Sequence, residues 1–179
     1  DKARGFCGSG LIALLAEMFI TGVIDKSGNI NLDLPTERVR RGAHGPEYVV
    51  VWARESDTGQ DIAITRVDID NLLRAKAAIY AGFAVLAESV GVPKETVEQV
   101  FIGGAFGQYI NVEKAVQIGL LPDMPWENFH FMGNTSVLGA YYALIDRGAR
   151  AQLTGVADRM TYIESVSYTH LTLPTNREV

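Results

Sequence analysis

Three glycine-containing segments of the chain have the composition of ligand-binding turns: Gly8-Ser9-Gly10, Gly103-Gly104 and Gly133-Asn134-Thr135-Ser136. Where an apolar strand ends in glycine and a helix follows, free backbone N–H groups at the helix start suit a phosphate or the edge of a nucleotide. Gly103-Gly104 is the strongest, because two missing Cβ atoms let a flat ligand lie against the backbone. The alternative is a tight turn that needs a positive φ. For Gly133-Asn134-Thr135-Ser136 we expect mainly helix capping.

Lys76 is a second candidate for ligand binding. It falls on or beside an apolar stripe that recurs close to every 3.6 residues and should face the core. One role is structural, with the alkyl stem packed on the core and the ammonium in water. The other is a cation that points into a cleft, toward a ribose or a phosphate. The stripe consists of Ile69, Leu72, Leu73, Ile79, Phe83, Leu86 and Val90.

Metal and disulfide chemistry have little support in the sequence. Cys7 is the single cysteine, which excludes an internal disulfide, a Cys-built zinc site and an iron–sulfur cluster held by this chain alone. We expect Cys7 to be a small buried residue at a helix start, where the helix N-terminus would lower the pKa of its thiol. The histidines His44, His130 and His170 have no carboxylate or cysteine at ligand spacing, so we assign no metal site.

Periodicity and turn residues predict the elements that position these residues. A helix from about Leu11 to Phe19 starts after Gly10 and stops near Gly22. Thr65 is a natural N-cap for a long helix over residues 66–90. The other predicted elements are strands over residues 48–52 and 61–64, which read as a hairpin, further strands over 97–102, 129–132 and 160–164, and helices over 112–118 and 137–145. Strands and helices alternate in the second half, so the fold class is α/β with at least part of its sheet parallel.

The overall charge argues against a polyanionic partner. Sixteen Lys and Arg stand against 21 Asp and Glu, a net charge of −5, so neither nucleic acid nor an anionic membrane is expected. One segment, residues 35–46, is polar and basic, and we expect an exposed loop there. Its arginines Arg38, Arg40 and Arg41 would be solvated, or would dock an acidic partner surface.

Length and composition predict one cytoplasmic globular domain. The 179 residues are 47% hydrophobic, and no apolar run reaches the roughly 20 residues that span a bilayer. The chain starts at Asp1 without an initiator methionine, and we expect a fragment of a larger protein. We place the domain at residues 1–164. Residues 165–179 lack helical or strand patterning and are interpreted as a non-native or disordered tail.

Six sequence blocks resemble, in the same order, the reductive activators of corrinoid proteins. Each block is weak alone, and the six in register are specific. The resemblance covers about residues 3–164. The blocks are ARGFCGSGLI (3–12), ITRVDI (64–69), LRAKAAIYAG (73–82), VFIGGAFGQYI (100–110), IGLLP (118–122) and FMGNTS (131–136).

The resemblance implies a multi-domain ATPase with an actin-like C-terminal region of the ASKHA class. Such proteins use ATP with Mg²⁺ to drive electron transfer from a [2Fe-2S] domain, absent from this chain, to an inactive Co(II) corrinoid. The chain would then be the second lobe of an actin-like, ribonuclease-H-like fold, with a mixed sheet flanked by helices. A corrinoid protein would be its partner, and a homodimer is a further expectation.

The resemblance also implies roles for individual residues. Gly103, Gly104, Ala105 and Phe106 match the adenosine-binding turn of the second actin-like lobe, and Lys76 resembles a helix lysine that reaches the nucleoside. Gly8, Ser9 and Gly10 resemble a turn that opens a helix near the nucleotide. These expected site residues are, in full, Gly8, Ser9, Gly10, Lys76, Gly103, Gly104, Ala105 and Phe106.

Part of an ATPase site is absent from the sequence, which leaves alternatives open. No carboxylate pair accompanies a glycine-rich loop to hold Mg²⁺, and the Asp-x-Gly phosphate loop is missing, so no catalytic residue is assigned. One alternative is another enzyme of the same fold, such as an activator of 2-hydroxyacyl-CoA dehydratases or a small-molecule kinase. Another is a non-catalytic lobe for docking or dimerisation.

Overall fold

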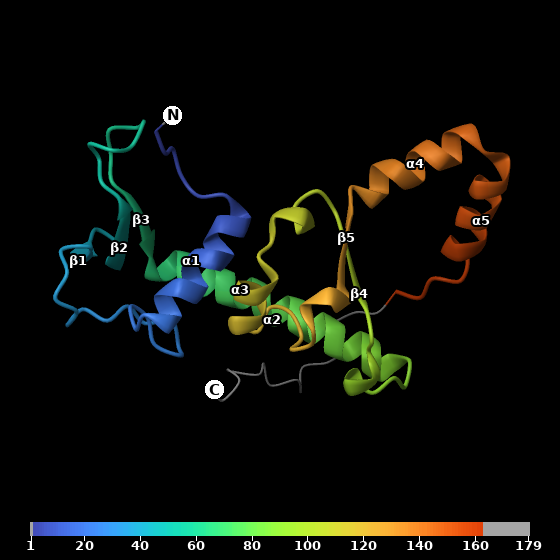
Figure 1. Cartoon of the computed structure of the whole chain (residues 1–179), viewed down its shortest axis with the longest axis horizontal. Helices are drawn as coiled ribbons and strands as arrows, with labels where there is room; N and C mark the ends of the chain where they lie inside the picture. Colours follow the sequence, from blue (N-terminus) through green and yellow to red (C-terminus); the bar gives the residue numbers. More distant parts are fainter. Residues whose placement is uncertain (1, 163–179) are drawn as a thin grey trace. The chain divides into compact units, whose positions relative to one another are not determined.

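The computed structural model describes residues 2–162, which form two compact units. Unit 1 comprises residues 2–81 and 111–123, and unit 2 comprises residues 82–110 and 124–162. Figure 1 shows the elements in chain order: α1 (Gly8–Ile20), β1 (Val39–Gly42), β2 (Gly45–Val51), β3 (Ile62–Thr65), α2 (Arg66–Ser89), β4 (Val100–Gly103), α3 (Val112–Gln117), β5 (Phe129–Gly133), α4 (Thr135–Ile145) and α5 (Arg147–Ala157). Single turns of 3-10 helix lie at Lys94–Thr96, Gly107–Tyr109 and Trp126–Asn128.

Helix α1 confirms the first predicted helix and corrects the prediction for Cys7. The Cys7 side chain is the N-cap, and its sulfur accepts a hydrogen bond from the Gly10 N–H at 3.3 Å. A capping side chain must lie beside the free N–H groups of the first turn, outside the helix body. Cys7 is therefore exposed, and its predicted burial is wrong.

Strands β1, β2 and β3 form an antiparallel sheet in unit 1 that is larger than the predicted hairpin. The β2–β3 hairpin is confirmed. The predicted loop over residues 35–46 is wrong for residues 39–42, which form β1 and pair with β2, and for residues 45–46, which begin β2. Its polar composition concealed an edge strand, and charged side chains are common on such strands. Arg40 contacts Glu47 and Asp61, both at 2.8 Å, and Arg38 donates to the carbonyl oxygens of Val49 and Val50.

The contacts of Asp61 predict a pH-dependent stability. Its carboxylate accepts the Ala53 N–H at 2.7 Å and contacts Arg40, and these two interactions, in that order of size, lower its pKa. The charged carboxylate therefore favours the folded state above about pH 4, the ordinary aspartate value, and this contribution is lost as the pH falls through the lowered pKa. In urea unfolding, Asp61→Asn should be less stable than wild type at pH 7, with the difference shrinking toward pH 3. An unchanged difference would contradict the assignment.

Helix α2 begins as predicted, at a reciprocal capping box. Asp68 N–H donates to the Thr65 hydroxyl at 3.3 Å, and Thr65 N–H donates to the Asp68 carboxylate at 2.9 Å. The predicted extent of residues 66–90 is confirmed to within one residue. No helix over residues 2–162 has both the length and the apolar composition needed to cross a membrane.

The apolar stripe predicted on α2 is right only near the start of the helix. Ile69 is fully buried, whereas Ile79 and Leu86 are more than half exposed and Val85 is buried in their place. Residues 66–81 belong to unit 1 and residues 82–89 to unit 2. Because the buried side is set separately within each unit, a single stripe cannot describe the whole helix.

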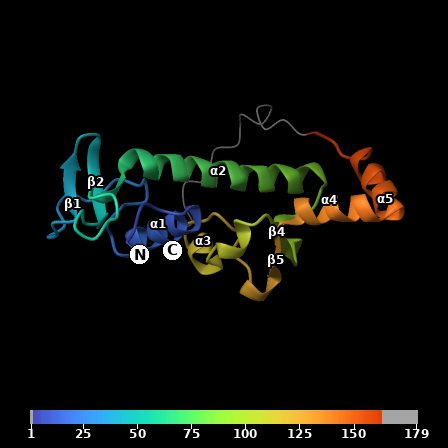
Figure 2. The ribbon, with the colours of Figure 1, turned by 90° about the horizontal axis from the view of Figure 1, so that it is seen from above.

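The core of unit 1 gathers around α1. Helix α3 packs beside α1 (Figure 2), and Lys114 of α3 contacts Glu17 of α1 at 2.5 Å. Asn111 caps α3 by accepting the Lys114 N–H at 3.1 Å, which confirms the predicted helix there. The buried apolar residues of unit 1 are Ile12, Leu15, Ala16, Met18, Ile24, Ile30, Val49, Ile64, Ile69, Ala115, Ile118 and Leu120.

Unit 2 contains a parallel strand pair, which confirms the α/β prediction. Strands β4 and β5 pair in parallel and lie side by side in Figure 1. Helix α4 follows β5 as expected, with Asn134 as its N-cap. Helix α5 was not predicted, although Asp146 carries an N-cap signal and accepts the Gly148 N–H at 2.7 Å.

The strand predicted over residues 160–164 is wrong for its first three residues, which belong to no strand. These residues follow the end of α5, and no strand within residues 2–162 pairs with them. Ile163 and Glu164 lie outside the described residues, as do His170 and the whole of the expected tail over residues 165–179.

Candidate functional site

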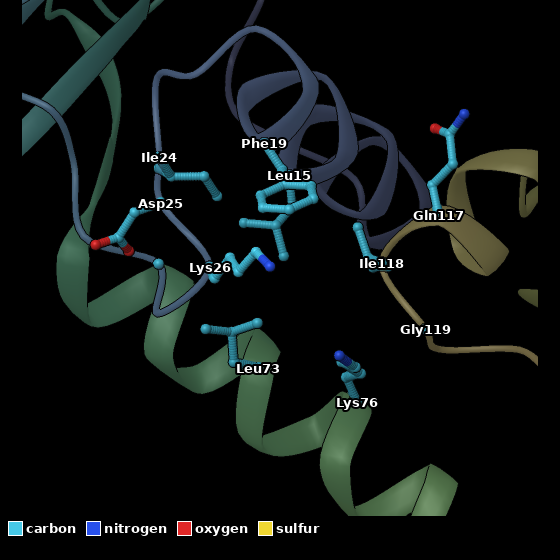
Figure 3. Close-up of a pocket in the computed structure, with 11 residues that line it drawn as sticks. Leu15, Phe19, Ile24, Asp25, Lys26, Leu73, Lys76, Gln117, Ile118 and Gly119 are labelled. Carbon is cyan, nitrogen blue, oxygen red and sulfur yellow. The ribbon is translucent and has the colours of Figure 1, made fainter. Parts of the chain in front are cut away.

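A small pocket in unit 1 has Lys76 on its wall (Figure 3). Its cavity volume is about 50 Å³, far below the roughly 300–1,000 Å³ of a pocket that encloses a whole small-molecule ligand. It has room for one group of a ligand rather than for a nucleotide. It is lined by Leu15, Phe19, Ile24, Asp25, Lys26, Gly28, Leu73, Lys76, Gln117, Ile118 and Gly119.

The Lys76 side chain has the features of a binding cation at this wall. It is half-buried on α2, and burial lowers the pKa of its ammonium. A Cβ added at Gly119 would lie 3.3 Å from both the Cε and the Nζ of Lys76, so the glycine leaves the space that the ammonium uses. Desolvation without a compensating charge makes an anionic or hydroxyl-bearing group a favourable neighbour.

The loop from Asp25 to Asn29 forms another wall of the pocket. Asp25 accepts the N–H groups of Ser27 and Asn29 at 2.9 and 2.8 Å. The Asn29 side chain is the largest cause of the lowered pKa of the Asp25 carboxyl. Gly28 is buried with φ +78°, and a Cβ on this residue would meet the side chains of Ile69 and Leu73 of α2. The sequence analysis did not identify this segment as a pocket wall.

Gly8, Ser9 and Gly10 form the first turn of α1. The Gly10 N–H is already bonded to Cys7, and the Ser9 hydroxyl lies 3.5 Å from the same sulfur. These two contacts, with Ser9 the larger, lower the pKa of the Cys7 thiol. None of the three residues lines the pocket that contains Lys76. Their nucleotide role remains a prediction.

Gly103 and Gly104 differ in their surroundings. A Cβ added at Gly103 would lie 2.7 Å from the Thr135 hydroxyl oxygen, whereas one at Gly104 would meet nothing within 4 Å. Gly104 has φ +99°, a left-handed conformation that favours glycine. The positive φ expected of a tight turn is therefore confirmed at Gly104, which also has an open face.

The backbone of this turn offers fewer donors than expected. The Gly104 N–H donates to the Gly133 carbonyl oxygen at 2.7 Å, and the Gly107 N–H donates to the Gly104 carbonyl oxygen at 3.1 Å. These two N–H groups are not free, so the expectation of unpaired donors is wrong for them. The turn therefore presents an open surface, and Phe106 adds a side chain that is half exposed.

The predicted site residues thus fall into two groups. Gly8, Ser9, Gly10 and Lys76 belong to unit 1, and Gly103, Gly104, Ala105 and Phe106 belong to unit 2. Within unit 1, Lys76 and the glycine turn of α1 do not share the pocket. Sequence reasoning missed the pocket residues Gly28 and Gly119. A signal for Gly119 was present, since it lies in the block Ile118-Gly119-Leu120-Leu121-Pro122.

The side chains that could bind a metal lie apart over residues 2–162. No three His, Cys, Asp or Glu side chains in that range gather closely enough to hold a metal ion. His130 instead stacks on Phe101, with ring centroids 5.1 Å apart.

Comparison with known proteins agrees with the α/β architecture. A protein family described as the C-terminal domain of RACo, the ASKHA domain, matches residues 1–172. The corrinoid activation enzyme RamQ of Eubacterium limosum is 35% identical over 168 residues, which cover 90% of this chain and 28% of RamQ. The methylated amine-specific Co(II) corrinoid protein reductase of Methanosarcina barkeri is 28% identical over 160 residues, or 89% of this chain and 26% of the reductase.

A solved structure shows the same fold. It is a reductive activator for corrinoid, iron-sulfur protein, with a TM-score of 0.83 and 47% identity, and the match covers 90% of this chain and 26% of that one. The chain thus spans about a quarter of the length of the relatives it matches. The predicted actin-like fold is confirmed, and the chain belongs to the family of the C-terminal ASKHA domain of RACo.

Proposed function

We propose that this chain is part of an ATP-dependent reductive activator that returns the Co(II) corrinoid of a methyltransferase system to Co(I). Membership of the ASKHA family over residues 1–172 carries the proposal. The matched relatives are named as corrinoid activators or reductases, which supports a corrinoid protein as the partner. By this proposal the electrons come from a [2Fe-2S] cluster in a part of the protein outside the chain, since one cysteine cannot hold a cluster.

The fit of ATP to this chain rests on features described separately in each unit. In unit 2 the open face of Gly104 and the exposed ring of Phe106 give a surface on which a flat base can lie. In unit 1 the Lys76 ammonium is a desolvated donor for a hydroxyl or phosphate oxygen. When bound, ATP supplies the free energy for an uphill electron transfer. The role of Gly8, Ser9 and Gly10 as a turn near the nucleotide is part of the same proposal.

The Mg²⁺ that accompanies ATP needs ligands beyond those described. Residues 2–162 provide no cluster of three metal-binding side chains. The sequence has no carboxylate pair at a glycine-rich loop, and on that ground the proposal places the carboxylates that hold Mg²⁺ and orient water outside this chain. This chain would supply nucleotide contacts and not the hydrolytic groups.

The 179-residue chain by itself should therefore bind ATP weakly and hydrolyse none. Calorimetric titration with ATP measures the first property, and release of inorganic phosphate measures the second. A Lys76→Ala chain is the control. Phosphate release by the wild-type chain well above that control would contradict the division of the site proposed here.

The full-length protein tests the activity itself. Reduction of a Co(II) corrinoid protein is followed by visible absorbance, with an excess of reductant, in the presence and absence of ATP. We expect Co(I) to accumulate only with ATP. Equal reduction without ATP would remove the nucleotide from the mechanism, and phosphorylation of a small molecule in place of corrinoid reduction would indicate a kinase.

A homodimer and a cytoplasmic location complete the proposal. Helix α4 has no charged residue and no buried side chain, so it presents an apolar surface of the kind found at protein interfaces. Its exposed large side chains are Val137, Leu138, Tyr141, Tyr142, Leu144 and Ile145. The single cysteine supports a reducing compartment.

A further inference from the structure

We propose that the Thr135 hydroxyl restricts residue 103 to glycine, and that this lets the glycine turn at Gly103-Gly104 keep its ligand-binding conformation beside α4. The proposal rests on the proposed function, because it assigns to the turn the binding of ATP. It gives separate roles to the two glycines: Gly103 leaves room for the Thr135 side chain, and Gly104 is the position that faces the ligand.

The packing role of Gly103 follows from its distances to Thr135. A Cβ on residue 103 would lie 2.7 Å from the Thr135 Oγ1, 3.6 Å from its Cγ2 and 3.7 Å from its Cβ. Only the first distance is too short for ordinary van der Waals contact. The Thr135 hydroxyl oxygen therefore stands where a side chain on residue 103 would begin.

The two strand ends are also joined through their backbones. The Gly104 N–H donates to the Gly133 carbonyl oxygen at 2.7 Å, one of the shorter hydrogen bonds of this kind. Gly133 and Thr135 are separated only by Asn134, which caps α4 by accepting the Val137 N–H at 3.1 Å. A shift of Thr135 away from residue 103 would disturb the segment that accepts the Gly104 N–H.

Thr135 has little freedom to move aside. It is the first residue of α4, directly after the N-cap, so its backbone is fixed by the helix. A β-branched side chain in a helix has few χ1 rotamers available. A new methyl group on residue 103 would therefore displace its own turn, including the open face of Gly104.

The test is a set of substitutions in the full-length protein. The variants are Gly103→Ala, Gly103→Ala with Thr135→Ala, and Gly103→Ala with Thr135→Val. Alanine at 135 removes Oγ1 and leaves only the Cβ at 3.7 Å, whereas valine keeps a branched side chain of similar shape. ATP affinity is measured by calorimetry, and hydrogen exchange is measured on the peptide spanning residues 100–107.

Gly103→Ala should weaken ATP binding about tenfold, the scale of mild overpacking. It should also speed exchange in the 100–107 peptide. When Thr135→Ala is added to Gly103→Ala, ATP affinity and the exchange rate should both return to wild-type values. When Thr135→Val is added instead, neither should return. Gly104→Ala should weaken ATP binding whether residue 135 is Thr or Ala, because a Cβ on residue 104 would not contact Thr135.

The outcomes separate this inference from the proposed function. If the wild-type protein does not bind ATP, the proposed function fails, and the exchange data still decide whether Thr135 and Gly103 are coupled. If ATP binds but Thr135→Ala gives no rescue of either readout, the proposed restriction of residue 103 by Thr135 is wrong. Rescue by valine as well as alanine would also overturn it, because the steric cause would then be incorrect.

Discussion

Replacing Lys76 with methionine in the full-length protein should lower ATP affinity by about 10- to 100-fold, the range of a lost charge-assisted hydrogen bond. Methionine keeps the unbranched stem that packs on the pocket wall and removes only the ammonium. Arg74→Met is the matched control, since it removes a positive charge from an exposed position two residues away on the same helix. Calorimetric titration with ATP is the measurement. Equal losses for the two variants would show a general charge effect and no specific contact.

The same substitution should stabilise the folded protein at neutral pH. Burial lowers the pKa of Lys76, so the folded state binds fewer protons there than the unfolded state between the lowered pKa and the ordinary lysine value of about 10.4. Wild-type stability therefore rises with pH across that window, and the advantage of Lys76→Met shrinks. Thermal unfolding at pH 7 and pH 10 checks the sign. A variant that binds ATP poorly and also unfolds earlier at pH 7 would indicate a structural role for the ammonium.

Gly28→Ala should cost about 2–5 kcal/mol of unfolding free energy, the sum of left-handed strain and overpacking. Gly28 has φ +78°, and a Cβ there would lie 2.8 Å from Ile69 Cγ2 and 2.9 Å from Leu73 Cδ1. Both neighbours belong to α2, and Ile69 is fully buried, so it has no space to retreat. The new methyl group would push the loop away from the helix.

Gly59→Ala is the control for Gly28→Ala. Gly59 has φ +68° but is exposed, and a Cβ there would meet nothing within 4 Å. It should cost only the strain of the left-handed conformation, about 1–2 kcal/mol. Urea unfolding of both variants gives the comparison. Equal losses would mean that the contact with α2 does not limit residue 28.

The predictions that held depend on local signals. The Thr65 cap and the strand at Phe129 are each encoded within a few residues, so periodicity and capping rules found them. Strand β1 was missed because it is polar and its Arg40 is paired with Glu47 and Asp61 on later segments. A pairing across such distances leaves no signature in the strand itself.

The candidate site, like the fold, was predicted only where the signal is local. Helical spacing was enough to single out Lys76, because its position depends on α2 alone. The different surroundings of Gly103 and Gly104 could not be predicted, since they depend on Thr135, more than 30 residues later in the chain. The importance of Gly28 likewise comes from its contact with Ile69 and Leu73 of another element.

The discontinuity of unit 1 has a consequence for synthesis on the ribosome. Helix α3 packs on α1, yet residues 82–110 of unit 2 lie between the two segments of unit 1. At about 5–20 residues per second, translation of those residues takes roughly 1.5–6 s. During that interval α1 and its Glu17 have emerged without α3 and Lys114. The nascent chain therefore carries an uncovered apolar face for seconds, and this is the period in which a ribosome-associated chaperone would be most useful.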